Sequence, residues 1–167
     1  VKTNEVLKDG WFHTGDIGQI DNDFLKITDR KKEMFKTSGG KYVAPQLLEN
    51  SLKASHLIEQ LMVIGEGRKF PSALIVPSAD GVKEYCRRKD IPYTSHAEML
   101  KNDKIVAKIK RDVAKANSEY GSWEQIKKYE LLAVPFTIDG GELTPTLKLK
   151  RKPIKEKYKD LIESIYA

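Results

Sequence analysis

Residues 61–76 read LMVIGEGRKFPSALIV, two short apolar runs on either side of a turn sequence. The first run, residues 61–64, ends at Gly65-Glu66-Gly67, and glycines spaced in this way are typical of a turn between strands. The second run, residues 72–76, is equally short and apolar, as buried strands are. The pattern therefore predicts a buried β-hairpin.

Regularly spaced apolar residues predict helices on both sides of this hairpin. Ahead of it, Pro45 stands where a helix would begin, and Leu48 and Leu52 recur at helical spacing up to about Lys53. After it, the pattern predicts a helix with Val82, Tyr85 and Cys86 on one face, followed by a short helix capped by Ser95. A long helix from Asn102, a strand at 131–134 and a final helix from Pro153 are predicted next. Residues 31–167 are thus expected to form a small α+β domain.

The first thirty residues have a different pattern. Glycines such as Gly10 and Gly15 recur there, and between them lie short runs such as residues 24–28, which are apolar at alternate positions. We therefore expect residues 1–30 to form strands and turns, a β-rich appendage that the polar segment 30–33 connects to the domain.

The composition is that of a folded chain with a basic surplus. Of 167 residues, 40% are hydrophobic and 32% are charged, which is enough apolar material for a core and excludes a disordered tail. Thirty Lys and Arg against 24 Asp and Glu give a net charge of +6, which permits phosphate-bearing partners without requiring them. The single cysteine, Cys86, excludes an internal disulfide framework and fits a reducing compartment.

Segments that would direct or anchor the chain in a membrane are not expected. No apolar run approaches the roughly 18 to 20 residues of a membrane-spanning helix, and the signal-peptide pattern is missing. The sequence starts at Val1 rather than Met, in the middle of a pattern. We therefore expect a cytoplasmic piece of a longer protein, for which peripheral contact with a membrane is left open.

Metal sites and nucleophiles are not expected either. His13, His56 and His96 are far apart in the sequence, and Cys86 has no partner at ligand spacing, so no metal-binding residue is assigned. Cys86 falls on the apolar face of a helix, where a cysteine packs rather than reacts. The sequence contains no phosphate loop of the Gly-x-x-x-x-Gly-Lys type, so this chain alone cannot bind a triphosphate in that way.

Polar stretches are the remaining candidates for a site, and the first is GWFHTGDIG at residues 10–18. Asp16 follows a glycine turn in this stretch. A carboxylate in that place can accept hydrogen bonds from the two hydroxyls of a ribose. An aspartate in an ordinary β-turn fits the spacing equally well.

Two further stretches are rich in cations. Residues 28–41, TDRKKEMFKTSGGK, lead from a polar connector into a loop where Gly39 and Gly40 let a ligand approach the backbone. A solvated linker with a tight turn is the alternative. Residues 141–152, GELTPTLKLKRK, are stiffened by Pro145, and a charged solvent-exposed face is their default interpretation.

In this order and spacing, the three stretches resemble the closing motifs of the adenylate-forming superfamily, which contains acyl-CoA synthetases, luciferases and the adenylation domains of peptide synthetases. The run Trp11-Phe12-His13-Thr14-Gly15-Asp16 resembles the motif W-[YF]-x-T-G-D. Residues 29–33 with 38–40 are similar to the hinge and glycine-loop motif. Residues 143–148, LTPTLK, are similar to the C-terminal lysine motif of long-chain fatty acid-CoA ligases, whereas many other members have Ser-Gly or Thr-Gly before the lysine.

The resemblance implies a fold and a reaction. Residues 31–167 would be the mobile C-terminal lid domain, a short β-sheet with helices packed on it, and residues 1–30 would be the end of the large adenylation domain. The enzyme would use ATP to convert a fatty acid into an acyl-adenylate, and after domain rotation it would transfer the acyl group to coenzyme A. Mg²⁺ would accompany ATP, bound mainly by the missing N-terminal domain. The fragment alone is expected to be inactive, because the phosphate loop and the acyl pocket would precede Val1.

The resemblance also implies roles for individual residues. Asp16 and Arg30 would bind the ribose of the adenylate, and the rigid fork of donors of Arg30 suits that task. Lys32 would be the hinge about which the domain turns. Lys148 would be the catalytic residue, because an ammonium between a carboxylate and an α-phosphate offsets the repulsion of the two anions. The channel for the pantetheine arm of coenzyme A would be lined by Lys36, Ser38, Gly39 and Gly40.

Two other functions remain open at this point. One is an adenylate-forming enzyme that loads the phosphopantetheine of a carrier protein instead of free coenzyme A. The other is a basic nucleic-acid-binding module, since residues 148–159 hold seven basic residues and one acidic residue. Tyr158 lies on an apolar stripe rather than among these cations, and no RNA-binding aromatic signature is present. We therefore expect no nucleic-acid partner.

Overall fold

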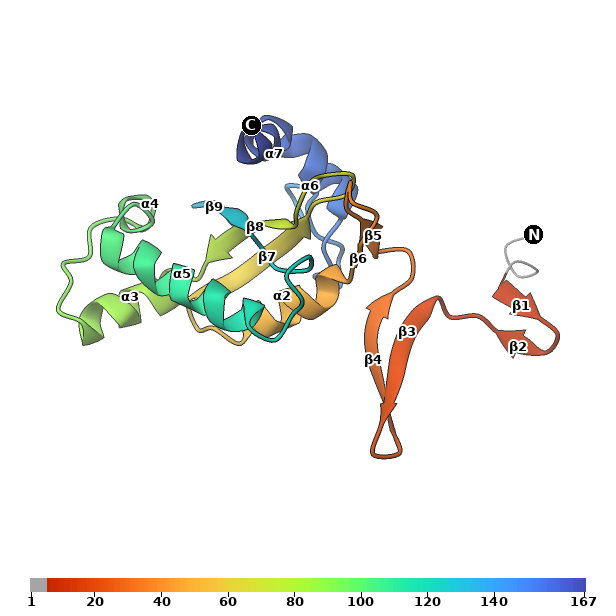
Figure 1. Cartoon of the computed structure of the whole chain (residues 1–167). Coiled ribbons are helices and arrows are strands. Elements are labelled where there is room, and N and C mark those ends of the chain that lie inside the picture. Colours follow the sequence, from red (N-terminus) through yellow and green to blue (C-terminus); the bar gives the residue numbers. More distant parts are fainter. Residues whose placement is uncertain (1–5) are drawn as a thin grey trace.

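A three-stranded sheet forms the centre of the fold. In the computed structural model, which describes residues 6–167, strands β7 (Ile58–Ile64) and β8 (Ser72–Pro77) pair antiparallel, and β9 (Lys128–Leu131) pairs parallel to β8. β8 is therefore the middle strand (Figure 1). The predicted hairpin is confirmed, and residues 65–71 form its loop.

The two faces of this sheet explain why the hairpin is apolar at nearly every position. Leu61, Val63 and Ile75 belong to one buried cluster, whereas Met62 and Leu74 belong to a second one. Neighbouring residues of a strand point to opposite faces, so a strand that is covered on both faces needs an apolar side chain at each position.

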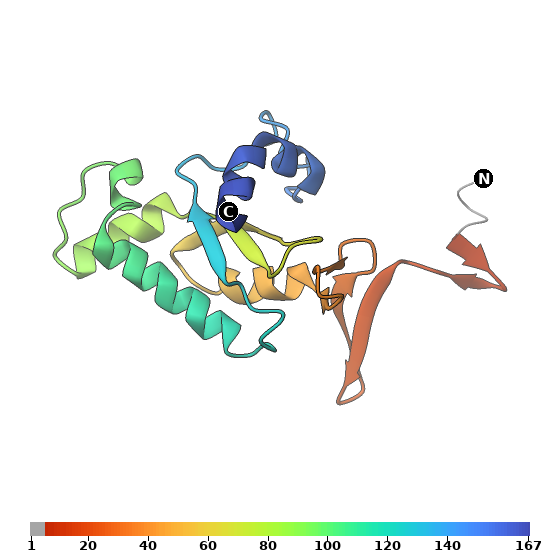
Figure 2. The ribbon, with the colours of Figure 1, turned by 45° about the horizontal axis from the view of Figure 1, so that its top comes forward.

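Helices cover both faces of the sheet (Figures 1 and 2). The first face is covered by α2 (Pro45–Lys53), α3 (Ala79–Arg88), α4 (His96–Met99) and α5 (Asp103–Asn117), and the second by α6 (Arg151–Lys157) and α7 (Lys159–Tyr166). This confirms the expected α+β architecture. Ser95 caps α4 as predicted, Asn102 is the N-cap of α5 at the predicted start of the long helix, and Cys86 packs in the core on α3. Among the described residues, no helix has the length and apolar character to cross a membrane.

The last strand lies three residues earlier than the pattern predicted, so the prediction of a strand at 131–134 was wrong. β9 ends at Leu131, where its pairing with β8 ends. Beyond it, the backbone N–H of Phe136 donates to the side chain of Gln60 at 2.7 Å, and the Gln60 amide donates to the Phe136 carbonyl at 3.0 Å. These two bonds join residue 136 to β7 instead of continuing the pairing with β8, and Val134 is 63% exposed.

The final helix also differs from the prediction. It begins at Arg151 rather than at Pro153, and it breaks at Tyr158 into α6 and α7. Pro153 is the third residue of α6, where its missing N–H removes no helical hydrogen bond. Ile154 and Ile165, on either side of the break, are both buried in the second cluster, as the apolar stripe predicted.

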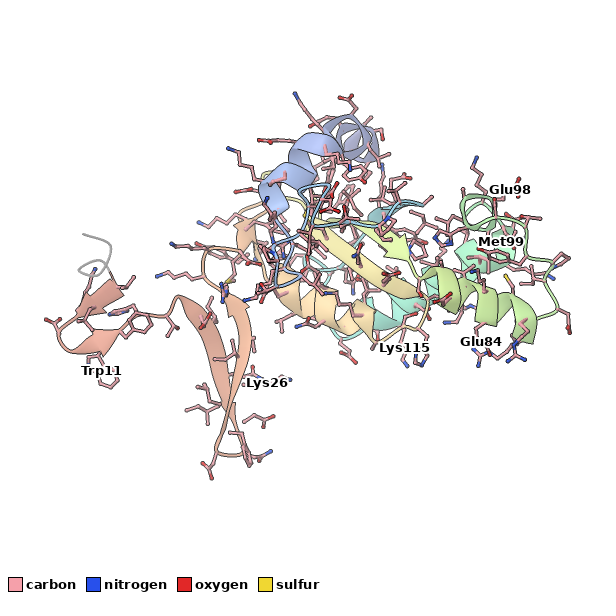
Figure 3. The ribbon with its side chains drawn as sticks, turned by 180° about the vertical axis from the view of Figure 1, so that it is seen from behind. Trp11, Lys26, Glu84, Glu98, Met99 and Lys115 are labelled. Atoms are coloured by element: carbon pink, nitrogen blue, oxygen red, sulfur yellow. The ribbon has the colours of Figure 1, made fainter. Side chains whose placement is uncertain are left out.

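Two hairpins project from the domain on its N-terminal side (Figure 1). β1 (Leu7–Lys8) pairs with β2 (Trp11–Phe12), and β3 (Asp16–Asp21) pairs with β4 (Phe24–Arg30). The predicted strands and turns are thus confirmed for residues 6–30, while residues 1–5 lie outside the described part of the chain. The apolar side chains of these hairpins are largely exposed, and Trp11 projects from the outer one (Figure 3). A short hairpin of β5 (Phe35–Lys36) and β6 (Tyr42–Val43) follows.

Candidate functional site

Lys148 lies on a hairpin loop that holds its backbone in place. Leu143 and Leu149 form an antiparallel bridge at the base of the loop. The N–H of Thr144 donates to the Lys148 carbonyl at 2.8 Å, and the N–H of Lys148 donates to the Thr144 hydroxyl at 3.0 Å. Leu143 is buried, whereas Lys148 is exposed. The loop therefore fixes the backbone of Lys148 and presents its side chain to solvent.

Leu147, directly before Lys148, has a backbone conformation that favours glycine. Its φ is +59°, and the residue is 69% exposed. Its N–H donates to the Thr144 carbonyl at 2.8 Å, which closes a turn whose last residue is left-handed. A leucine is strained in this region, and little burial of its side chain offsets the strain.

Replacing Leu147 with glycine should relieve this strain. We expect Leu147→Gly to raise the free energy of unfolding by about 1 kcal/mol, measured by chemical denaturation. Val134→Gly is the matched control, because Val134 is similarly exposed but is not left-handed, and this change should lower stability. A loss of stability in both variants would contradict the inference that Leu147 is strained.

Glu142 anchors the base of the same loop from inside. The residue is 1% exposed. One carboxylate oxygen accepts a hydrogen bond from the ammonium of Lys157 on α6, and the other accepts the N–H of Thr137 at 3.1 Å. The hydrogen bond from Lys157 lowers the pKa of Glu142, although burial acts in the opposite direction. An ionised Glu142 thus links the lysine loop to α6.

This carboxylate should make stability depend on pH. Because the native pKa of Glu142 lies below its ordinary value of 4.5, its contribution is complete above that pH and is lost as the pH falls through the native pKa. We expect Glu142→Gln to cost about 2 kcal/mol at neutral pH and much less at about pH 3, measured by denaturation across that range. Glu130 is exposed on β9, so Glu130→Gln is the control and should change the free energy of unfolding little at either pH. An equal cost for Glu142→Gln at both pH values would contradict the ionised state.

Asp16 and Arg30 are brought together by the pairing of β3 with β4. The two residues are directly opposite in the antiparallel register, and the Nε of Arg30 lies 3.4 Å from the Oδ1 of Asp16. The N–H of Asp16 also donates to the Thr14 hydroxyl at 3.1 Å. The side chain of Asp16 is 30% exposed and that of Arg30 is 53% exposed, so both can reach a polar ligand in solvent.

Arg30 and Lys148 line one cleft, which we call the Lys148 cleft. It has a volume of about 350 Å³ and lies between the end of β4, α2 and the lysine loop. Its wall also includes Glu49 and Arg151. The structure therefore brings Arg30 and Lys148, together with the ion-paired Asp16, into one region from three separate motifs.

Arg151, the first residue of α6, ties together the elements behind this cleft. Its guanidinium contacts the two carboxylate oxygens of Glu49 at 2.9 and 3.0 Å and donates to Glu33 at 3.2 Å. It also donates to the carbonyl of Val63 at 3.3 Å, while the N–H of Val63 donates to Glu49 at 2.8 Å. These bonds connect α6 and the adjoining lysine loop to α2, to β7 and to the turn after β4.

The buried pair of Glu49 and Arg151 was not found from the sequence. Burial raises the pKa of Glu49, and the charge of Arg151 opposes that rise. Burial also acts to lower the pKa of Arg151, but Glu49 and Glu33 outweigh it and the pKa is raised. Arg151 therefore keeps its charge. The only signal in the sequence was a carboxylate at position 49, beside Leu48 on the apolar face of a helix.

The glycine loop between β5 and β6 presents open backbone. Gly40 has φ of +75°, and its N–H donates to the Thr37 carbonyl at 2.9 Å. A Cβ added to Gly39 would meet only the Thr37 hydroxyl, at 3.9 Å. Ser38 is exposed beside them. The backbone at Gly39 and Gly40 is thus open to close approach by a ligand.

The two predicted lysines near this loop are both exposed. Lys36 ends β5, and its ammonium lies 4.6 Å from the centroid of the Tyr42 ring. Lys32 lies in the turn that joins β4 to β5, where the N–H groups of Glu33 and Met34 donate to the carbonyl of Arg30. Neither lysine lines the Lys148 cleft. The predicted residues therefore fall into two groups, one at that cleft and one at the glycine loop.

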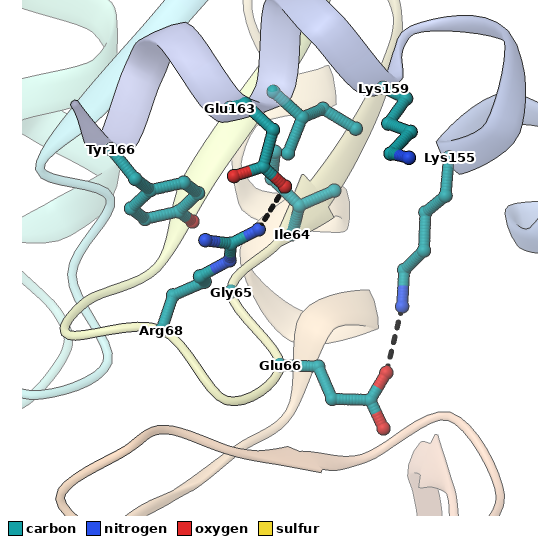
Figure 4. A pocket seen from close by; sticks show the side chains of 9 residues that line it. Ile64, Gly65, Glu66, Arg68, Lys155, Lys159, Glu163 and Tyr166 are labelled. Atoms are coloured by element: carbon teal, nitrogen blue, oxygen red, sulfur yellow. Dashed lines mark hydrogen bonds and ion pairs between the residues drawn. The ribbon is translucent and has the colours of Figure 1, made fainter.

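A smaller cleft of about 180 Å³ lies next to the glycine loop, between the β7–β8 loop and α6 and α7 (Figure 4). The two loops are joined by the N–H of Ser38, which donates to the carbonyl of Arg68 at 2.8 Å. Arg68 pairs with Glu163, and the ammonium of Lys155 lies 2.8 Å from Glu66. The carboxylates of this cleft are thus neutralised by cations of the protein.

Comparisons with known proteins identify the family of this chain. Residues 32–167 match the family model described as AMP-binding enzyme C-terminal domain. The chain belongs to this family. Among curated members it is 43% identical over 166 residues to long-chain-fatty-acid–CoA ligase FadD15 of Mycobacterium tuberculosis, a match that covers 98% of this chain and 28% of that protein. It is 41% identical over 170 residues to long-chain-fatty-acid–CoA ligase 5 of Mus musculus, covering 99% of this chain and 25% of that protein.

Solved structures of the family share the fold. The adenylation domain of a carboxylate reductase from Mycobacterium chelonae has a TM-score of 0.76 at 28% identity, covering 99% of this chain and 24% of that one. The corresponding domain from Segniliparus rugosus, solved in complex with AMP and a co-purified carboxylic acid, has a TM-score of 0.75 at 25% identity, with 99% and 25% coverage. The chain thus spans about a quarter of the length of the proteins it matches.

Proposed function

We propose that this chain is the C-terminal part of an ATP-dependent acid–thiol ligase that joins a long-chain fatty acid to coenzyme A. In the first step a carboxylate oxygen attacks the α-phosphorus of ATP, and pyrophosphate leaves. In the second step the thiol sulfur attacks the carbonyl of the acyl-adenylate, and AMP leaves. The observation that carries the proposal is the exposed Lys148 on a bonded loop, in the same cleft as Arg30. The names of the two curated relatives support the substrate class.

For the first step, we assign the Lys148 cleft. The ammonium of Lys148 would lie between the carboxylate and the α-phosphate, where negative charge gathers in the transition state. Asp16 would accept hydrogen bonds from the ribose hydroxyls, and Arg30 would donate to the ribose. Their ion pair at 3.4 Å supports this joint role. Mg²⁺ accompanying ATP is assigned to the large adenylation domain.

For the second step, we assign the glycine loop. Lys32 would be the hinge, because it is exposed in a short turn at the border of the family model, which starts at residue 32. After rotation, Ser38, Gly39 and Gly40 would line the path of the pantetheine arm, with Lys36 beside it. The open backbone of the loop supports this assignment, because nothing but the Thr37 hydroxyl would meet a Cβ there.

We also propose that residues 1–30 belong to the preceding adenylation domain and residues 31–167 to the mobile lid. Three apolar side chains of the projecting hairpins support this division, since Trp11 is 76% exposed, Ile20 is 79% exposed and Phe24 is 78% exposed. Large apolar side chains in one exposed region mark a surface that packs against another part of a protein.

The test is an assay of both half-reactions in an enzyme that joins this chain to its adenylation domain. With hexadecanoate, ATP and Mg²⁺ we expect pyrophosphate release, and with coenzyme A we expect hexadecanoyl-CoA and AMP. The 167-residue chain alone should form no acyl-CoA. Transfer to a carrier-protein phosphopantetheine but not to coenzyme A would favour the other acceptor, and no adenylate from any carboxylic acid would overturn the proposal.

A further inference from the structure

A groove at the far end of the domain carries a cluster of cations. It has a volume of about 720 Å³ and lies between the C-terminal end of α3 and the outer face of α5. Figures 1 and 2 show this end of the molecule opposite the projecting N-terminal hairpins. Four basic residues line the groove, namely Lys89, Lys104, Lys110 and Arg111, and none of the described residues that line it is acidic.

These four cations have no partner of their own. Within the part of the chain that the structure describes, none of them makes a side-chain hydrogen bond or an ion pair. Two carboxylates of the helices that flank the groove are engaged elsewhere, since Glu84 of α3 pairs with Arg87 and Asp112 of α5 pairs with Lys108. This distinguishes the groove from the cleft in Figure 4, where acidic side chains neutralise Arg68 and Lys155.

The floor of the groove is apolar. Tyr85 and Ile91 contribute the floor on the α3 side, each 7% exposed in total. On the α5 side, Ala107 and Ala114 lie seven residues apart on one helix face, and their small side chains leave the hollow open. An anion without an apolar part would leave this floor in contact with water, and an apolar molecule without a charge would leave the cations uncompensated.

We propose that this groove binds one amphiphilic anion of the long-chain carboxylate class, with its head group at the cations and its chain along the floor. Charge complementarity selects an anion, because four lysine and arginine residues and no acidic residue line the groove. The concave apolar floor selects a single chain, because a flat surface cannot reach its buried atoms. The binding is a property of this chain itself and does not depend on the proposed ligase activity.

The direct test uses the 167-residue chain with its alanine methyl groups labelled for NMR. Dodecanoate, at concentrations where it is monomeric, should shift the methyl signals of Ala107 and Ala114 and leave those of Ala97 and Ala133, outside the groove, unchanged. Acetate has the same head group without a chain, and dodecyltrimethylammonium has the same chain with the opposite charge. Neither should shift the groove signals, and added salt should weaken the binding of dodecanoate.

Two variants separate charge from shape. Lys110→Gln with Arg111→Gln should weaken dodecanoate binding about fivefold, as expected for two exposed charge contacts. Lys101→Gln with Lys115→Gln removes the same charge outside the groove and should leave binding unchanged. Ala107→Leu fills the groove at an exposed helical position and should abolish binding while the unfolding transition stays intact, with Ala97→Leu as its control.

Several outcomes would overturn the proposal. Groove signals that shift equally with acetate would indicate a simple anion site. Groove-dependent binding to phosphatidylglycerol vesicles without any response to monomeric dodecanoate would indicate a membrane-docking surface. Binding of a single-stranded oligonucleotide or an acidic peptide there, again without dodecanoate binding, would assign the cations to a macromolecular partner. Shifts spread evenly over all alanines would remove the groove as the site.

Discussion

Replacing Lys148 with alanine in the proposed complete ligase should lower the rate of adenylate formation by about a hundred- to a thousandfold, the usual loss for one preorganised charged donor in a transition state. The loss should appear in kcat, because the ammonium acts where charge develops rather than in ground-state binding. Pyrophosphate release from ATP and hexadecanoate measures it. Thioester formation from supplied hexadecanoyl-adenylate and coenzyme A should remain near the wild-type rate, because the proposed mechanism assigns that step to the glycine loop and not to Lys148.

Lys150→Ala is the matched control for this experiment. Lys150 is exposed in the same loop but does not line the Lys148 cleft. Its replacement by alanine removes the same charge. Its variant should keep most of the adenylation rate. If Lys148→Ala slowed both half-reactions equally, the ammonium would not be specific to adenylation and the assignment would be wrong. Denaturation curves of the two variants should coincide with the wild type, because both side chains are exposed.

Replacing Arg151 with alanine should lower the free energy of unfolding by about 4 kcal/mol, the largest stability loss that we expect for a single charged residue of this domain. The change would leave the carboxylate of Glu49 buried without its main partner, and that side chain is only 6% exposed. It would also remove the Arg151 donor from the carbonyl of Val63 and from Glu33, which keeps its hydrogen bond from Gln46. Chemical denaturation of the 167-residue chain at neutral pH measures the loss.

Two further variants show whether an uncompensated buried charge causes this loss. Lys152→Ala, at the next position of α6 and exposed, should cost less than about 0.5 kcal/mol. The pair Glu49→Leu with Arg151→Met removes both charges and should recover more than half of the stability, because neither ion is then left alone. A double variant that is less stable than Arg151→Ala would show that the network contributes through its geometry instead.

The central part of the fold could be predicted because strands that are buried on both faces have apolar side chains at nearly every position. Residues 61–64 and 72–76 are covered on two faces, so each position had to be apolar, and the hairpin was evident. β9 was misplaced by three residues because its ending depends on β8 and on the side chain of Gln60, both distant in the sequence. The break at Tyr158 left the apolar stripe intact, so periodicity alone could not detect it.

The candidate site was predictable to the extent that short motifs carry it. The motifs singled out Asp16, Arg30 and Lys148, and the structure brings them together through strand register and a shared cleft. The support behind that cleft was not predictable. Arg151 and Glu49 are 102 positions apart, and with thirty basic residues in the chain nothing in the sequence pairs these two.

The left-handed leucine before the lysine has a consequence for how this motif is recognised. Hydrogen bonds of Thr144 with Leu147 and Lys148 hold the turn, and φ of +59° at Leu147 is tolerated without a glycine. Glycine adopts such a φ without strain, so a glycine at this position is compatible with the same backbone turn. A sequence search that requires glycine before the lysine would therefore miss this chain.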